Sequence, residues 1–293
     1  VQVYGGEDAA TPDYGKVYIS IKAKSGSNLT TATKESLVQS LKSYAVASVT
    51  PVIIDPETTF ITLVVNFRYN SGITTKDVST LQTNVLTKIA SYNNDTLEDF
   101  AGMFRYSKLI EAVNDADTSI LSNITTVKMY KYFTPTLNSG IKYTLSYNNA
   151  LYNPHSGHNS SGGGVISSSG FKVNNDSSLN EHFLDDDGAG NLRLYYLSGT
   201  TRVYTDTTYG TVNYTTGEVV LTSAHITSIS NVDGATSTQV RVFATPSSND
   251  VVPVRNQVLS IDTSNSTITG EVDGIESGSS QAGTTYTTTS SYS

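Results

Sequence analysis

The stretch ITLVVNF (residues 61–67) decides how the first half of this chain folds. Its odd-numbered positions hold Ile, Leu, Val and Phe, so every second side chain is large and apolar. Side chains alternate between the two faces of a strand, and this pattern predicts a strand with one buried face. The polar run NSG (residues 70–72) predicts its end.

Two helices are expected after this strand. Thr74 and Asp77 have the spacing of a capping box, although Asp is a weaker partner there than Glu. Apolar residues then recur at helical steps of three and four, at Val78, Leu81, Val85 and Ile89. A shorter helix is expected to begin at Ser107, a suitable N-cap residue, and VKMY (residues 127–130) reads as the next strand.

Upstream of residue 61, the sequence predicts one more strand and one more helix. Residues 16–22 alternate like a half-buried strand, and residues 30–48 carry a helical stripe that Pro51 terminates. The resulting order, β-α-β-α-α-β, predicts a compact α+β domain over residues 1–134. We expect its helices to cover one face of a mixed sheet.

Residues 135–273 are predicted to form an all-β domain, either a sandwich or a partial barrel, because they hold short strand patterns between Gly, Asn, Asp and Ser. The strand candidates are residues 141–147, 165–173, 192–197, 239–243 and 258–261. The clearest hairpin is GTVNYTTGEVVLT (residues 210–222), where Gly217 would supply the left-handed residue. Residues 155–164 read as a polar loop, and residues 274–293 as a low-complexity tail.

Composition limits the functions that the chain can have. It holds 293 residues with a net charge of −8, which disfavours nucleic acid and anionic membranes as partners. Cysteine is absent, so disulfides, thiolate catalysis and Cys-type zinc sites are excluded. The sequence also has no apolar run of the roughly 20 residues that span a bilayer.

The acidic segment DDDGAGN offers a weak metal candidate in Asp185, Asp187 and Asn191. Phe183 and Leu194 stand where an EF-hand loop requires acids, so the EF-hand pattern does not fit. A tight turn between strands is the preferred interpretation, because Asp, Gly and Asn supply turn dihedrals. A calcium loop of another type is the alternative.

We identify no catalytic residues and expect no cofactor. His155 and His158 lie close together in a Ser/Gly-rich segment without a local third ligand, so solvated loop histidines are the preferred interpretation. The other two histidines are His182, beside Glu181, and the isolated His225. Asp55 and Glu57 are best explained as a turn between strands, although a carboxylate pair is also what glycoside hydrolysis needs.

Three segments carry a resemblance to a known family: GGED with PDYGKVYISIK near the start, FRYSKLIEAVNDADTSILSNITTVKMYK at residues 104–131, and DVVPVRNQVLSI at residues 250–261. They resemble the C-terminal half of the larger baseplate wedge protein, the gene-six product, of T-even-like contractile-tailed phages. The chain also begins at Val1 rather than at methionine, from which we expect it to be part of something longer.

This resemblance implies a structural virion protein of the tail baseplate, assembled in the host cytoplasm. Proteins of that family form dimer contacts with further copies of themselves, contact other baseplate wedge proteins, and close into a ring around the tail hub. No catalytic residue comes with the family, so the resemblance implies no enzyme.

Two other functions compete with this one. A glycan-binding β module is the first, with Tyr195, Tyr196 and Tyr209 stacking on sugars, although aromatic residues at strand spacing more often fill a core or an interface. A polysaccharide-cleaving enzyme is the second, and loss of its activity on a carboxylate-to-amide change would identify it.

Overall fold

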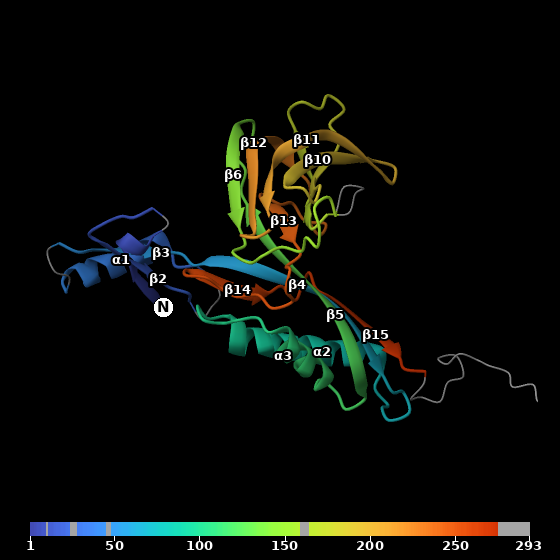
Figure 1. Ribbon diagram of the computed structural model, residues 1–293. Coiled ribbons are helices and arrows are strands. Elements are labelled where there is room, and N and C mark those ends of the chain that lie inside the picture. Colours follow the sequence, from blue (N-terminus) through green and yellow to red (C-terminus); the bar gives the residue numbers. More distant parts are fainter. Residues whose placement is uncertain (10, 24–27, 45–47, 159–163, 275–293) are drawn as a thin grey trace, which may run out of the picture.

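The computed structural model describes residues 1–9, 11–23, 28–44, 48–158 and 164–274. Within these ranges the chain has few helices, and its strands form three sheets. Figure 1 shows an elongated middle layer with the N-terminal residues at one end, helices along its lower side and a strand-rich lobe above it. The predicted tail from residue 275 onward and residues 159–163 of the predicted polar loop lie outside the described residues.

The first 54 residues build a small sheet of their own. Its elements are β1 (Gln2–Gly5), β2 (Lys16–Ser20), α1 (Thr31–Lys42) and β3 (Thr50–Ile54). β1 is antiparallel to β2, while β2 and β3 are parallel and are joined by the crossover helix α1. The Thr30 hydroxyl caps α1 by accepting a hydrogen bond from the backbone N–H of Thr33 at 3.2 Å.

The middle layer is a sheet with the order β14-β4-β5-β13-β7, and β15 continues the β14 edge further along β4. Its strands are β4 (Glu57–Tyr69), β5 (Ile120–Phe133), β7 (Ile166–Ser168), β13 (Val240–Ala244), β14 (Gln257–Ile261) and β15 (Thr267–Val272). β14 and β15 are both parallel to β4, whereas β5 is antiparallel to it. The end of the chain therefore completes a sheet that residue 57 begins.

The alternation predicted for β4 is confirmed. Ile61, Leu63, Val65 and Phe67 are fully buried, and the side chains between them are partly or well exposed. The helices α2 (Val78–Tyr92) and α3 (Tyr106–Asn114) lie beneath this sheet in Figure 1. They bury Leu81, Val85, Ile89, Leu109 and Val113 against it. A turn of π-helix (Asn93–Leu97) follows α2.

The predicted helix starts require correction. Asp77, not Thr74, caps α2, because the Asp77 carboxylate accepts a hydrogen bond from the backbone N–H of Thr80 at 2.8 Å. The α3 helix begins at Tyr106, one residue before Ser107. The backbone N–H of Tyr106 donates a hydrogen bond to the carboxylate of Asp250 at 2.8 Å. The free N–H group at the start of α3 is therefore paired with a side chain 144 positions away, and not with the local cap that the sequence predicts.

The upper lobe is a partial barrel. Its strands are β6 (Gly140–Ser146), β8 (Phe171–Val173), β9 (His182–Asp186), β10 (Asn191–Ser198), β11 (Thr201–Asn213) and β12 (Glu218–Ile229). The sheet order is β11-β10-β9-β8-β12-β6, and pairing of β11 with β12 closes it. The predicted hairpin at residues 210–222 is confirmed, with Gly217 at a φ of 72°.

The predicted order β-α-β-α-α-β is not reproduced. The strands β1 and β3 add to it, so residues 1–133 run β-β-α-β-β-α-α-β in two separate sheets. Pro51, which the sequence predicts to terminate a helix, lies inside β3, and this strand is therefore absent from the predicted order. Within the described residues, no helix is long and apolar enough to cross a membrane. The division at residue 134 stays a prediction.

Candidate functional site

The segment that suggested a metal site is held by buried ion pairs. Asp185 on β9 lies directly opposite Arg193 on β10, and its carboxylate accepts a hydrogen bond from the Arg193 Nε at 2.9 Å. The side chains are 1% and 7% exposed, respectively. The other carboxylate oxygen accepts hydrogen bonds from Arg202 at 2.6 Å and from the Tyr204 hydroxyl at 2.8 Å. Asp185 is thus saturated by donors from β10 and β11.

Aromatic rings cover the two arginines of this cluster. The Arg193 guanidinium lies 4.4 Å from the centre of the Tyr204 ring, and that of Arg202 lies 4.7 Å from the centre of the Tyr195 ring. Burial raises the pKa of Tyr204, and its hydrogen bond to Asp185 acts in the same direction. Tyr195, proposed from sequence as a sugar-stacking residue, is 8% exposed and packs against Phe183 and Tyr204.

The other two metal candidates form a turn. Asp187 accepts hydrogen bonds from the backbone N–H groups of Ala189 and Asn191, and from the Asn191 side chain at 2.6 Å. Burial opposes ionisation, yet these hydrogen bonds lower the pKa of Asp187 below its usual value. Among the described residues, no group of three or more His, Asp or Glu side chains has the arrangement of a metal site. An ion at this turn stays a prediction.

The carboxylates considered for glycoside hydrolysis both have lysine partners. Asp55 pairs with Lys34 at 2.6 Å, and Glu57 pairs with the largely buried Lys131 at 3.0 Å. The first pair joins the β3–β4 connection to α1, and the second joins β4 to β5. Their contacts are those of structural ion pairs between neighbouring elements.

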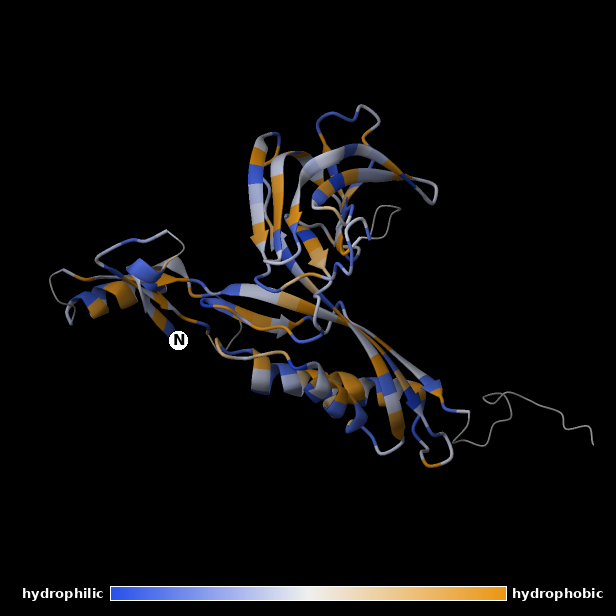
Figure 2. Ribbon diagram, viewed as in Figure 1, coloured by the Kyte–Doolittle hydropathy of each residue, from blue (hydrophilic) through white to orange (hydrophobic). Residues whose placement is uncertain are grey.

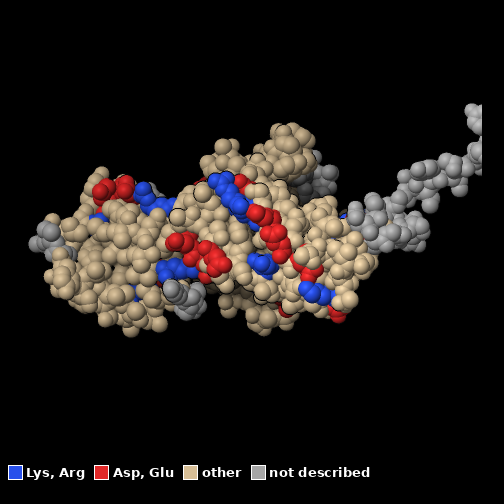
Figure 3. Space-filling model, turned by 90° about the horizontal axis from the view of Figure 1, so that it is seen from below, with Lys and Arg blue, Asp and Glu red and all other residues tan. Residues whose placement is uncertain are grey.

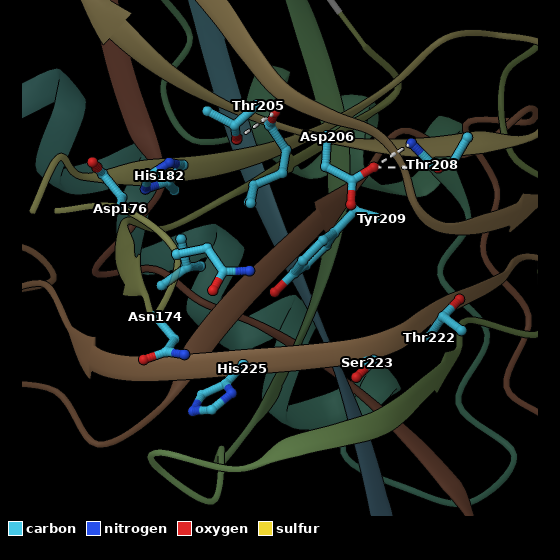
Figure 4. Close-up of a pocket in the computed structure, with 13 residues that line it drawn as sticks. Asn174, Asp176, His182, Thr205, Asp206, Thr208, Tyr209, Thr222, Ser223 and His225 are labelled. Carbon is cyan, nitrogen blue, oxygen red and sulfur yellow. Dashed lines mark hydrogen bonds between the residues drawn. The ribbon is translucent and has the colours of Figure 1, made fainter. Parts of the chain in front are cut away.

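The histidines fall into two groups. His155 and His158 contact each other, with ring nitrogens 3.3 Å apart, in the segment after residue 154. His182 and His225, which have no sequence relationship, line one cavity in the upper lobe together with Tyr209 (Figure 4). Sequence reasoning singled out these residues separately, because only the closure of the barrel brings their strands together.

The N-terminal unit, residues 1–54, has almost no core. Of its described residues, Gly6, Ser20 and Pro51 alone are buried, and α1 buries none of its side chains. Six large apolar or aromatic side chains in it are exposed: Val1, Val3, Tyr14, Leu37, Tyr44 and Val49. Tyr14 and Tyr44 are the most exposed, at 81% and 89%. Figure 2 shows the apolar residues on α1 and on the strands beside it.

Polar contacts attach this unit to the middle layer. The Gln2 side chain accepts a hydrogen bond from the backbone N–H of Asn256 at 2.6 Å, and Arg255 donates to the carbonyl oxygen of Asp8 at 2.9 Å. Lys22 pairs with Glu98 at 3.3 Å. Since none of these contacts buries the apolar side chains of the unit, its apolar surface is left facing outward.

Charge does not gather in one sign on the face below the helices. Figure 3 shows Lys and Arg interspersed with Asp and Glu on this face. Such a mixed surface creates no strong field of either sign. It therefore gives no positively charged surface for a nucleic-acid backbone on this side.

Comparison with known proteins matches the two N-terminal parts of the structure separately. Residues 1–54 match the family described as baseplate structural protein gp6, C-terminal domain I, and residues 57–132 match C-terminal domain III of the same protein. The first 132 residues are thus similar to C-terminal domains of a gp6 baseplate structural protein. The first match ends with β3, and the second runs from β4 almost to the end of β5.

A curated relative supports the same family. The chain is 33% identical over 139 residues to the baseplate wedge protein gp6 of Enterobacteria phage T4. This match covers 46% of the chain and 21% of the relative, so the chain spans about a fifth of that protein. This likeness agrees with the family that the sequence resemblance indicated.

Proposed function

We propose that this chain is a structural part of a phage tail baseplate. Residues 1–54 form the surface through which it assembles with further copies of itself and with other wedge proteins. The assembled subunits close into a ring around the tail hub. The observation that carries the proposal is the N-terminal unit without a core. A unit of this size with almost no core is at best marginally stable on its own. Several large apolar side chains exposed on one small unit are typical of a protein interface.

The rest of the chain provides a rigid support for that surface. β4 and β5 form a long antiparallel pair that is flanked on both sides by strands from the C-terminal half. α2 and α3 bury their apolar faces on this sheet. The N-terminal unit is joined directly to this sheet at the β3–β4 junction, where Asp55 and Glu57 form ion pairs with lysines. A contact made by residues 1–54 is therefore coupled to a stiff body.

A second copy of the chain is the partner that this surface fits best. Six of its large apolar or aromatic side chains are exposed, and such residues are typical of the core of interfaces between identical subunits. A pair of identical surfaces related by a two-fold axis buries the same residues twice. We propose no catalytic role, because the likeness is to structural proteins and the two candidate carboxylates are engaged in ion pairs.

Immunogold labelling of intact virions with an antibody against this chain tests the location. We expect label at the baseplate end of the tail. Label on the head, or virions that lack the chain, would contradict the proposal.

A pair of mutant phages tests the surface. Tyr14→Ser combined with Tyr44→Ser removes the two most exposed aromatic side chains of the N-terminal unit, and we expect incomplete baseplates and loss of contracting tails. The matched control is Ile73→Ser, which changes a side chain that is 62% exposed outside this unit. Normal tails in both mutants would overturn the assembly role of residues 1–54.

A further inference from the structure

A cavity of about 460 Å³ opens in the upper lobe where β11 and β12 separate. The two strands pair from Gly210 to Asn213 only, and the pairing of β12 with β6 shifts register after Leu221. Beyond these points the strands splay, and residues of β8–β12 surround the space between them (Figure 4). Bulges at the rims of barrels commonly shape binding sites, and the volume lies in the roughly 300–1,000 Å³ range of small-molecule sites.

His182 is one of the residues around this cavity, and its ring carries a buried hydrogen-bonding atom without a partner. Its side chain is fully buried, and its Nδ1 lies 3.1 Å from the carbonyl oxygen of Asn180. A carbonyl oxygen can only accept, so Nδ1 carries the proton and Nε2 is an acceptor in the neutral ring. This Nε2 is buried without a hydrogen-bond partner. Leaving a buried polar atom unpaired is costly, so a ligand donor that reached this atom would be favoured.

Tyr209 supplies a second such group. Figure 4 shows its ring directed across the cavity from β11. Its hydroxyl lies near the backbone of His225 but makes no hydrogen bond of ordinary geometry and is buried. Burial raises the pKa of Tyr209 to about 12, and the nearby Asp206 carboxylate acts in the same direction, so the hydroxyl keeps its proton at neutral pH. The residue thus offers a donor, an acceptor and an apolar ring face.

The charges around the cavity select against anions. Two carboxylates, Asp176 and Asp206, line it together with amides and hydroxyls, and the described residues that surround it include no Lys or Arg. Asp206 is held in place by the backbone N–H and hydroxyl of Thr208. A phosphate or a uronate would meet negative charge without a compensating cation.

We propose that this cavity binds one unit of a neutral saccharide. A sugar ring carries many hydroxyl groups that both donate and accept, which matches the amides, hydroxyls and carboxylates of the lining. Its apolar C–H face suits the ring of Tyr209. His182 would accept from one sugar hydroxyl, and the Tyr209 hydroxyl would bond to another. This activity is additional to the assembly role and does not depend on it.

Saturation-transfer NMR with the whole chain tests the proposal. The probes are the methyl glycosides of glucose, galactose, mannose, rhamnose and N-acetylglucosamine, with glucuronate as the charged comparison. We expect transfer to the ring protons of at least one neutral glycoside, and much weaker transfer to glucuronate. Tyr209→Phe removes only a hydroxyl and should weaken the binding of that glycoside about fivefold, the effect of losing one neutral hydrogen bond.

A matched pair of variants locates the binding. Thr222→Leu fills the cavity from β12 at an exposed position, and should abolish the transfer. Thr211→Leu makes the same change on β11 outside the cavity, and should leave the transfer unchanged. No transfer from any of the neutral glycosides would overturn the proposal. Transfer that persists at full strength in both Thr222→Leu and Tyr209→Phe would also overturn it.

Discussion

The Nε of Arg193 lies 2.9 Å from the Asp185 carboxylate, directly across the β9–β10 hairpin, with both side chains nearly inaccessible to water. Removing one member of a buried pair leaves the other charge without compensation. We expect Asp185→Asn to lower the free energy of unfolding by about 3–5 kcal/mol, as measured by urea denaturation. The loss should be large because Arg193 and Arg202 both lose their counter-ion.

An exposed pair gives the control for this prediction. Asp233 contacts Arg241 at 2.7 Å, but its side chain is 58% exposed. We expect Asp233→Asn to change the free energy of unfolding by less than about 1 kcal/mol. Equal effects of the two substitutions would show that burial does not determine the strength of the Asp185 cluster.

Asp117 predicts a specific dependence of stability on pH. The Lys76 ammonium donates to its carboxylate, with additional hydrogen bonds from the Ser119 backbone and hydroxyl, and together they lower the pKa of Asp117 to about 2. A depressed pKa stabilises the folded chain above the unfolded value of 3.8, and this contribution is lost as the pH falls from about 4 to about 2. We expect Asp117→Asn to cost about 1–2 kcal/mol at pH 7, reduced by the exposure of Lys76.

Urea unfolding of the wild type and Asp117→Asn at pH 7 and at pH 2 measures this effect. The difference between the two proteins should become much smaller at the lower pH, where Asp117 is about half protonated in the folded chain. A difference of the same size at both pH values would show that the charge of Asp117 does not contribute to the free energy of unfolding, and that the hydrogen bonds of its turn do.

The cap of α2 distinguishes the observed helix start from the one predicted by sequence. The Asp77 carboxylate accepts a hydrogen bond from the backbone N–H of Thr80. The Thr74 hydroxyl accepts one from the backbone N–H of Lys76, in the turn before the helix. We expect Asp77→Ala to destabilise the protein by about 1 kcal/mol, and Thr74→Ala by clearly less. Thermal denaturation measures the loss of stability in each variant. A larger loss for Thr74→Ala would indicate that Thr74 is the N-cap, as the sequence predicts.

Gly270 tests the packing of the last strand on the sheet. It lies opposite Phe67 in the parallel pair of β15 and β4, and a Cβ at this position would lie 2.4 Å from the tip of the Phe67 ring. We expect Gly270→Ala to destabilise the protein by about 1–3 kcal/mol, because Phe67 is fully buried and cannot yield easily. The neighbouring Glu271→Gln, at an exposed position, should have little effect in the same denaturation experiment.

Sequence patterns predicted those elements whose signal is local. β4 and α2 carry strong periodicities over many residues, and both were found. β14 and β15 pair in parallel with β4, about 200 positions earlier in the chain, so nothing near β15 indicates its neighbour. The long strand β11 was predicted only in its hairpin half, because its first half is rich in Thr and Tyr without clear alternation.

The same reasoning explains what was missed at the candidate sites. The acidic turn was found, but the partners of Asp185 come from β10 and β11, and Arg193 becomes its neighbour only through the register of the hairpin. That register is readable in principle, since Arg193 and Asp185 lie symmetrically about the Gly-rich turn. The cavity of His182 and Tyr209 depends on closure of the partial barrel, for which the sequence has no local signal.

The solution mass of the chain, measured by light scattering over a wide range of concentrations, tests the assembly surface most directly. We predict a mass that rises with concentration to that of a dimer or a larger closed species, and a monomer at all concentrations for Tyr14→Ser combined with Tyr44→Ser. The Ile73→Ser control should associate like the wild type. A wild-type chain that stays monomeric throughout, or a double variant that associates equally well, would contradict self-assembly through residues 1–54.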